Sequence, residues 1–413
     1  MKKLLILILW ATGSSAFAQP VDSLIAAQER LVLAAEKDRS AKVSILQDLK
    51  LQRQRLLMEK TGLPVITSGL QLLKHPAMFI GYDPVFLQAR WVAHILSPEI
   101  ATGSVLRTND FRADSTVKGV RVGDTDYFLA NTRTDGTIVY DGFGFDRGHL
   151  APSADFRWNQ AALSQSYLYS NISPQPADFN RGIWGDLEDA LRNYVIRNPK
   201  SELFILTGPV LSNDLKRIER GKNKVAIPEK FWKVAYDLQN QRAIGFILPV
   251  SAAPPLHSYA VPVSEVEKLT GLTFFTGLDK ELRDKIRTTV DAKYWLPSSA
   301  TTEFAAIPQQ SLPPAHFNTI IAKDYMGRSE TVTVCGTVVS ARKSRAGNIL
   351  INLDKPFPDQ RFTIFIRDED LSNLPWDPLT SLQGKQVCIK GKVVNLSGTP
   401  AMYLERETQL SIR

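Results

Sequence analysis

The sequence predicts an α+β fold in which a central sheet is flanked by helices and is followed by a small β-barrel. Two apolar runs, 203–206 and 243–248, each lead into a turn containing Gly or Pro, as buried strands do. With 413 residues, 44% of them hydrophobic, the chain is long enough for two or more domains. The barrel, which we assign to the OB type, is predicted from five β-branched runs separated by Gly, Asp and Pro turns: 331–339, 349–353, 361–366, 386–394 and 402–404.

The N-terminus has the three parts of a secretory signal peptide. Lys2 and Lys3 form a positive start, an apolar run spans 4–10, and Ala16-Phe17-Ala18 is a small-x-small cleavage site. A membrane anchor is the alternative, but the run is much shorter than the roughly 20 residues that a spanning helix needs. We therefore predict that residues 1–18 are removed and that the protein is periplasmic or secreted, with no membrane attachment afterwards.

Composition predicts four further segments. Residues 19–64 form a helical segment, because 22–60 contain neither Pro nor Gly. Residues 75–298 form the mixed α and β domain, 299–314 are a linker rich in Ser, Thr, Ala and Pro, and 315–413 form the barrel. Asp38 and Arg53 break the leucine heptads of the helix, so it packs either on its own domain or on a second subunit, as in a homodimer.

Charge and cysteine content restrict the class of protein only weakly. Removal of Lys2 and Lys3 lowers the formal charge from +8 to 8 − 2 = +6, which suits a nucleic-acid partner but is also common among exported proteins. The two cysteines, Cys335 and Cys388, lie in predicted strands. They are too few for a disulfide scaffold, and an oxidising compartment permits a bridge between them if the strands are neighbours.

The chemistry is concentrated at His149 in a Gly-punctuated turn. Phosphodiester cleavage needs a base near neutral pH and a cation for the phosphate. His149 supplies an imidazole, and Arg147, two residues away on an extended strand, shares its face. A salt bridge between Arg147 and Asp146 or another acid is the alternative. No histidine belongs to an HxH or HExxH pattern, so a multi-histidine zinc site is not predicted.

Asn180 and Glu188 are the candidate metal-site residues. A neutral amide oxygen together with water suits Mg²⁺, although Asn at a helix start is also a common N-cap. Glu188 follows eight residues later, about 80° around a continuous helix, where it could hold a metal-bound water. A solvated helix carboxylate is the alternative for Glu188.

These residues stand in linked motifs that resemble a known family. Phe145-Asp146-Arg147-Gly148-His149-Leu150-Ala151-Pro152, Tyr169-Ser170-Asn171-Ile172-Ser173-Pro174-Gln175, Asn180-Arg181-Gly182-Ile183-Trp184 and Leu187-Glu188 are similar to motifs of the DNA/RNA non-specific endonucleases of the ββα-metal class. The likeness runs from about Gly81 to Phe275, roughly half of the chain.

The resemblance implies a role for each matched residue. His149 corresponds to the general base, Asn180 to the direct ligand of one Mg²⁺, for which Mn²⁺ could substitute, and Glu188 to the residue that orients metal-bound water. Arg147 shapes the site and its phosphate contacts, and Asn171 supports it in substrate binding.

Two further arginine positions are left open by the resemblance. An upstream arginine contacts the phosphate in this family, and Arg107 and Arg112 are both candidates here, with Arg107 slightly favoured. Arg181 replaces the glutamine of many relatives, so it either strengthens phosphate binding or faces solvent.

We therefore predict an exported, Mg²⁺-dependent endonuclease that hydrolyses DNA and RNA with His149 as base and leaves 5′-phosphates. The main alternative is an exported nucleic-acid-binding protein on a nuclease fold without turnover, and a phosphodiesterase for small nucleotides is a third. Basic residues Arg342, Lys343 and Arg345 follow the first barrel strand. The barrel therefore either adds affinity for nucleic acid or is a stabilising appendage.

Overall fold

The computed structural model describes residues 18–65, 69–103, 105–134, 136, 138–253, 255–296, 303–344, 347–357, 360–396 and 399–413, with side chains from residue 23 onward. Nearly all of the predicted signal peptide, Arg345 and the start of the predicted linker lie outside these ranges. Internal contacts divide the chain into two units, one ending at Arg53 and one spanning Gln54–Arg413.

A single helix of 44 residues, α1 (Ala18–Thr61), opens the described chain. Every side chain from Ser23 to Leu46 is exposed, including Leu24 and Leu31 at 68% and 64%. In the described part of the chain, no helix combines the length and apolar character needed to cross a bilayer.

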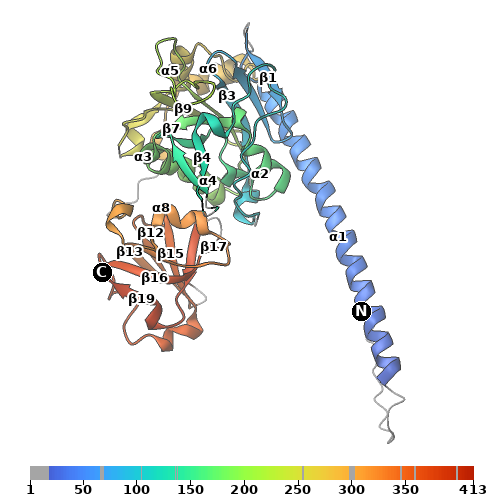
Figure 1. Cartoon of the computed structure of the whole chain (residues 1–413), viewed down its shortest axis with the longest axis vertical. Helices are drawn as coiled ribbons and strands as arrows, with labels where there is room; N and C mark the ends of the chain where they lie inside the picture. Colours follow the sequence, from blue (N-terminus) through green and yellow to red (C-terminus); the bar gives the residue numbers. More distant parts are fainter. Residues whose placement is uncertain are drawn as a thin grey trace, which may run out of the picture. The chain divides into compact units, whose positions relative to one another are not determined.

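The second unit is built on a seven-stranded antiparallel sheet (Figure 1), which confirms the predicted α+β class with a large central sheet. Each strand pairs with its neighbour through antiparallel registers. In spatial order the strands are β1 (Gln71–Lys74), β2 (Met78–Asp83), β3 (Gln88–Leu96), β8 (Leu203–Pro209), β9 (Lys230–Asp237), β10 (Arg242–Pro249) and β11 (Ala260–Val261).

Alternation along β9 gives the sheet two different faces. Trp232 and Val234 belong to the large apolar core, which also takes in side chains of α5 (Val263–Thr270) and α6 (Lys280–Thr288). Phe231 and Lys233 point the other way, where the Phe231 ring lies 5.7 Å from Trp184 and the Lys233 ammonium 4.7 Å from it. The second face therefore carries the elements that hold the motif residues.

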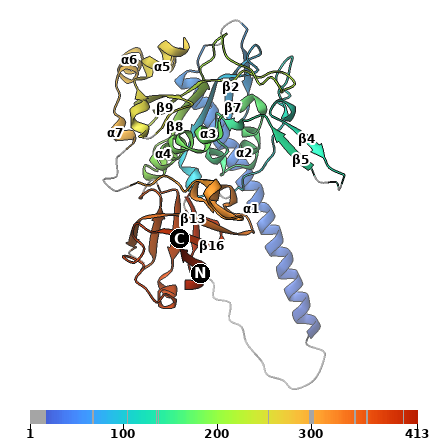
Figure 2. The ribbon, with the colours of Figure 1, turned by 60° about the vertical axis from the view of Figure 1, so that its left-hand side comes forward.

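Those elements are short and lie between β3 and β8 in the chain. They include the antiparallel pairs β4 (Phe128–Thr132) with β5 (Ile138–Gly142) and β6 (Asp146–His149) with β7 (Ile172–Gln175). In Figure 2 the β4 and β5 pair extends away from the central sheet. The remaining helices of this region are α2 (Gln160–Ser166), α3 (Ala177–Arg181), α4 (Ile183–Arg197) and, after α6, α7 (Ala292–Trp295).

The C-terminal region is a second β structure with its own apolar core. Each of the five predicted β-branched runs overlaps one of its strands: β13 (Thr331–Lys343), β14 (Ile349–Leu353), β15 (Phe362–Ile366), β16 (Gln386–Lys392) and β18 (Thr399–Tyr403). Three short strands were not predicted: β12 (His316–Asn318), β17 (Val394–Leu396) and β19 (Leu410–Ile412).

Cys335 and Cys388 form the disulfide that the sequence permitted. They lie directly opposite each other in the antiparallel register of β13 and β16. The bridge therefore joins neighbouring strands of this region across a chain separation of 53 residues.

Candidate active site

The motif residues are assembled on the β6–β7 pair and on the two helices that follow it, α3 and α4. Gly148 lies between Arg147 and His149, opposite Ser173 of β7. A Cβ at Gly148 would lie 2.2 Å from the side-chain oxygen of Gln175, so a larger residue would have to displace that buried side chain. The glycine thus leaves room for the Gln175 side chain between the flanking Arg and His.

His149 is fixed by two aromatic rings. Its ring centroid lies 5.0 Å from that of Tyr167 in an edge-to-face arrangement and 5.4 Å from that of Phe111. The Nε2 atom is buried and has no protein hydrogen-bond partner. Burial, assisted by the positive charges of Arg107 and Arg147, lowers the pKa of His149 to about 3. The imidazole is therefore neutral at physiological pH and can accept a proton.

Arg147 shares the face of His149, as strand alternation predicted. Its guanidinium lies 3.8 Å from the centroid of the same Phe111 ring and bonds to Asn109 at 3.1 Å and to Asp124 at 3.3 Å. The alternative, a salt bridge between Arg147 and Asp146 or another acid, is confirmed in its second form, because Arg147 pairs with Asp124 at 3.3 Å. Asp146 itself binds different residues.

Asp146 instead holds Asn180 and Arg181 of α3. The Asn180 amide nitrogen donates to Asp146 at 2.9 Å, and Arg181 donates to both carboxylate oxygens at 2.7 Å. This use of the amide nitrogen leaves the Asn180 amide oxygen available to a cation. Arg181 is 54% exposed and its guanidinium is paired with Asp146, so both a phosphate contact and a solvent-facing role stay predictions.

Glu188 does not lie on the same helix as Asn180, so the projection of 80° is wrong. The helix breaks at Gly182, whose φ of −95° and ψ of −119° are not helical. A Cβ there would come within 2.3 Å of the Asp178 carbonyl oxygen. α4 begins after this break, and Glu188 lies in its second turn.

Glu188 lies in a buried charged cluster. Its side chain is 13% exposed, and an Arg192 nitrogen lies 4.0 Å from it. Burial raises the pKa of Glu188 to about 7, against the opposing charges of Lys233 and Arg192. Arg192 also bonds to Asp155 and Asp189, at 2.7 and 2.6 Å. The carboxylate is therefore held by cations rather than solvated.

Comparison with known proteins identifies the family. Residues 59–281, more than half of the chain, match the family model described as DNA/RNA non-specific endonuclease. The chain belongs to this endonuclease family. It is 32% identical to mitochondrial endonuclease G of Homo sapiens over 235 residues, which are 52% of this chain and 72% of that protein.

Two further matches cover a similar share of this chain. A nuclease of Serratia marcescens is 28% identical over 54% of this chain and 80% of its own length. A solved structure of an EndoG/EndoGI complex is 27% identical, with a TM-score of 0.44, over 54% of this chain and 91% of the matched chain.

Endonucleases of this family use a divalent metal, and the donors around Asn180 can be tested against that requirement. Among the described residues, no group of three or more His, Cys, Asp or Glu side chains could hold a metal ion. One amide oxygen fixed by Asp146 suits a cation that keeps most of its water, as Mg²⁺ does, and does not suit structural zinc. The residues therefore fit a hydrated hard cation.

The two upstream arginines, Arg107 and Arg112, have different partners in the structure. Arg112 donates to the Ser164 carbonyl at 2.9 Å and to Asp110 at 2.7 Å, so it ties chain segments together. Arg107 lies close enough to lower the pKa of His149 and bonds to Asp324 of the C-terminal region at 2.5 Å. Of the two, Arg107 is the one whose charge lowers the pKa of the histidine.

Asn171 is fully buried and supports the site from behind. Its side chain accepts from the Ala151 N–H and donates to the Ala151 carbonyl, both at 2.9 Å, and also donates to the Ser166 carbonyl at 2.8 Å. These bonds fix the backbone just after His149, so Asn171 positions the base. The Asn171 amide itself is buried and does not reach the surface.

Sequence reasoning missed two residues of the site. Asp146 stands in the motif, but its partners depend on how α3 returns across β6. Lys233 is buried, donates to the Thr207 hydroxyl at 2.8 Å, and has its pKa lowered to about 8 by burial. Its place among apolar neighbours in Phe231-Trp232-Lys233-Val234 was the available signal, because a lysine inside a buried strand needs a specific partner.

Proposed function

We propose that this family member is an exported, Mg²⁺-dependent endonuclease that hydrolyses both DNA and RNA and leaves 5′-phosphates. The observation that supports it most is the placing of two groups on one ββα unit. His149 presents a neutral imidazole with an unpartnered Nε2, and Asn180 presents an amide oxygen whose orientation Asp146 sets.

Each residue of the site has a separate role in the proposed hydrolysis. His149 accepts the proton of the attacking water, and Asn171 holds the backbone beside it. Asn180 would hold Mg²⁺, which when bound stabilises negative charge on the phosphate and on the leaving 3′ oxygen. Glu188 keeps water oriented near the cation, while Arg147 and Arg107 bind the phosphate. Phosphate contacts carry little base information, which agrees with weak sequence preference.

For the C-terminal region we propose an OB-like barrel. Strand β13 pairs antiparallel with both β14 and β16, β14 continues to β15, and β15 pairs parallel with β18. That pairing supports a nearly closed five-stranded core to which the three short strands are added.

We also propose export and self-association. Cleavage after Ala18 would leave Gln19 as the N-terminus, which intact-mass measurement of protein from the secreted or periplasmic fraction would detect. The exposed leucines of α1 supply an apolar surface for a second copy, and light scattering of the mature protein should then give twice the monomer mass. A monomer mass would contradict the dimer.

The function is tested by incubating the mature protein with supercoiled plasmid and with structured RNA, in Mg²⁺ or in EDTA. His149→Ala and Asn180→Ala should abolish cleavage of both polymers. The matched controls His257→Ala and Asn213→Ala change exposed residues of the same types outside the site and should cleave normally. Binding without cleavage by the wild type would support the nucleic-acid-binding alternative.

A further inference from the structure

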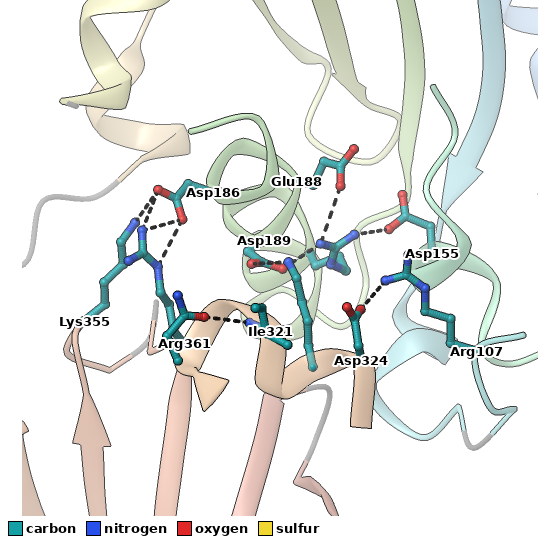
Figure 3. Close-up of polar contacts among 12 residues, drawn as sticks. Arg107, Asp155, Asp186, Glu188, Asp189, Ile321, Asp324, Lys355 and Arg361 are labelled. Atoms are coloured by element: carbon teal, nitrogen blue, oxygen red, sulfur yellow. Dashed lines mark hydrogen bonds and ion pairs between the residues drawn. The ribbon is translucent and has the colours of Figure 1, made fainter. Parts of the chain in front are cut away.

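The barrel region is anchored on the helix that carries Glu188 (Figure 3). Asp186 of α4 receives two cations from the barrel: Arg361, at 2.9 Å and 3.0 Å, and Lys355 at 3.2 Å. These three side chains are only 10 to 18% exposed. A largely buried cluster of opposite charges fixes geometry strongly, because separation would leave charges unpaired. It therefore holds the barrel against the nuclease site.

A short helical segment of the barrel reaches further toward the motif residues. It consists of α8 (Thr319–Ala322) and the 3₁₀ turn η7 (Lys323–Tyr325), and Asn318 caps it by accepting from the Ile321 N–H at 3.0 Å. Lys323 lies 3.5 Å from Asp189 of α4. The next residue, Asp324, forms the ion pair with Arg107.

Asp324 thus lies among the cations of the site. It is bonded to Arg107, and its negative charge also acts on Arg181. A carboxylate on a guanidinium makes the same kind of charge-assisted bonds as a substrate phosphate would. The single guanidinium of Arg107 cannot bond fully to Asp324 and to a substrate phosphate at the same time.

We propose that Asp324 is an affinity-determining residue of the nuclease site, contributed by the barrel, which competes with substrate phosphate for Arg107. The inference rests on the proposed function, because it takes Arg107 to be a phosphate ligand. The barrel then lowers the affinity of the site for nucleic acid and leaves the chemistry at His149 unchanged.

The competition does not require the barrel to detach. Arg107 and Asp324 are 44% and 45% exposed, whereas Asp186 and Arg361 are 10% and 12% exposed. An exposed ion pair is weak and is replaced at small cost, while the buried cluster is not. An arriving phosphate can therefore displace the Asp324 carboxylate while the barrel stays docked.

The test compares wild type, Asp324→Asn and Glu330→Gln by fluorescence anisotropy with a labelled single-stranded DNA of about 12 nucleotides. The titrations are made in EDTA, so that binding is measured without hydrolysis. Glu330 is an exposed barrel carboxylate and controls for the loss of one negative charge. Asp324→Asn should bind about 2- to 5-fold more tightly than wild type, and Glu330→Gln should match wild type.

Arg107→Gln and the double variant Arg107→Gln with Asp324→Asn complete a double-mutant cycle. The gain from Asp324→Asn should disappear when Arg107 is absent. Kinetics with Mg²⁺ should show a lower KM and an unchanged kcat in Asp324→Asn. Weaker binding or a higher KM would overturn the proposal and make Asp324 a positioning residue for Arg107.

The same experiment separates the proposal from the function on which it rests. An equal gain in Glu330→Gln, or a gain that survives Arg107→Gln, would overturn the competition even if the enzyme cleaves DNA. Failure of the wild type to cleave, with the affinity shift present, would overturn the proposed function and retain the competition. No binding by any variant would overturn both.

Discussion

Asp146→Ala tests whether the orientation of Asn180 controls metal binding. The substitution removes the carboxylate that holds the Asn180 amide at 2.9 Å and Arg181 at 2.7 Å. Asp146 is 18% exposed, so its bonds are only partly screened by solvent. A hydrogen bond to a charged group contributes about 1.5 to 3 kcal/mol, which corresponds to about 10- to 100-fold in an equilibrium constant.

We therefore expect the Mg²⁺ concentration for half-maximal cleavage to rise about 10- to 100-fold in Asp146→Ala. The rate at saturating Mg²⁺ should fall much less. The assay is a Mg²⁺ titration of plasmid nicking, with Asp141→Ala as the control. Asp141 is an exposed carboxylate on β5, the strand that precedes β6 in the chain, and it is paired with Arg220. Equal Mg²⁺ dependence in the two variants would refute the role given to Asp146.

Three further predictions concern pH and stability. Because the pKa of His149 is lowered from 6.5, the neutral base persists in mild acid. In a Glu188→Gln background, which removes the site carboxyl whose own pKa burial raises to about 7, the acid limb of kcat/KM should lie below pH 6.5 and should move upward when Arg147→Gln is added. A limb at or above pH 6.5 in that background would contradict this. Asp186→Ala should destabilise barrel docking by about 3 kcal/mol, seen as faster proteolysis near residues 303–314, and unchanged proteolysis would refute it. Cys335→Ser should lower the stability of the C-terminal region by about 4 kcal/mol for its 53-residue separation, and denaturant unfolding unaffected by the change would contradict that value.

Local patterns predicted much of this site because its geometry is set by strand alternation. Arg147 and His149 are two residues apart on β6 and contact the same Phe111 ring, as a period of two requires. The β-branched runs likewise overlapped five strands of the C-terminal region, because buried strands leave a strong composition signal. The three strands that escaped prediction have only three residues each, too few to show a period.

Tertiary placement decided the features that the sequence could not predict. The turn at Gly182 separates Asn180 from Glu188, and a lone glycine inside a helical pattern is often tolerated without a break. Asp146 pairs with α3 because the chain returns across β6, which no local pattern shows. Arg107 and Asp324 are 217 residues apart, so their contact depends on how the C-terminal region packs on the rest of the unit.

Chemical rescue of His149→Gly tests the central claim most directly. The substitution opens space between the rings of Phe111 and Tyr167, and added imidazole can then supply the missing base. If His149 is the general base, cleavage by the variant in Mg²⁺ should be nearly absent and should rise with the concentration of neutral imidazole. Cleavage that persists without imidazole, or that imidazole does not restore while His257→Gly remains fully active, would contradict the account.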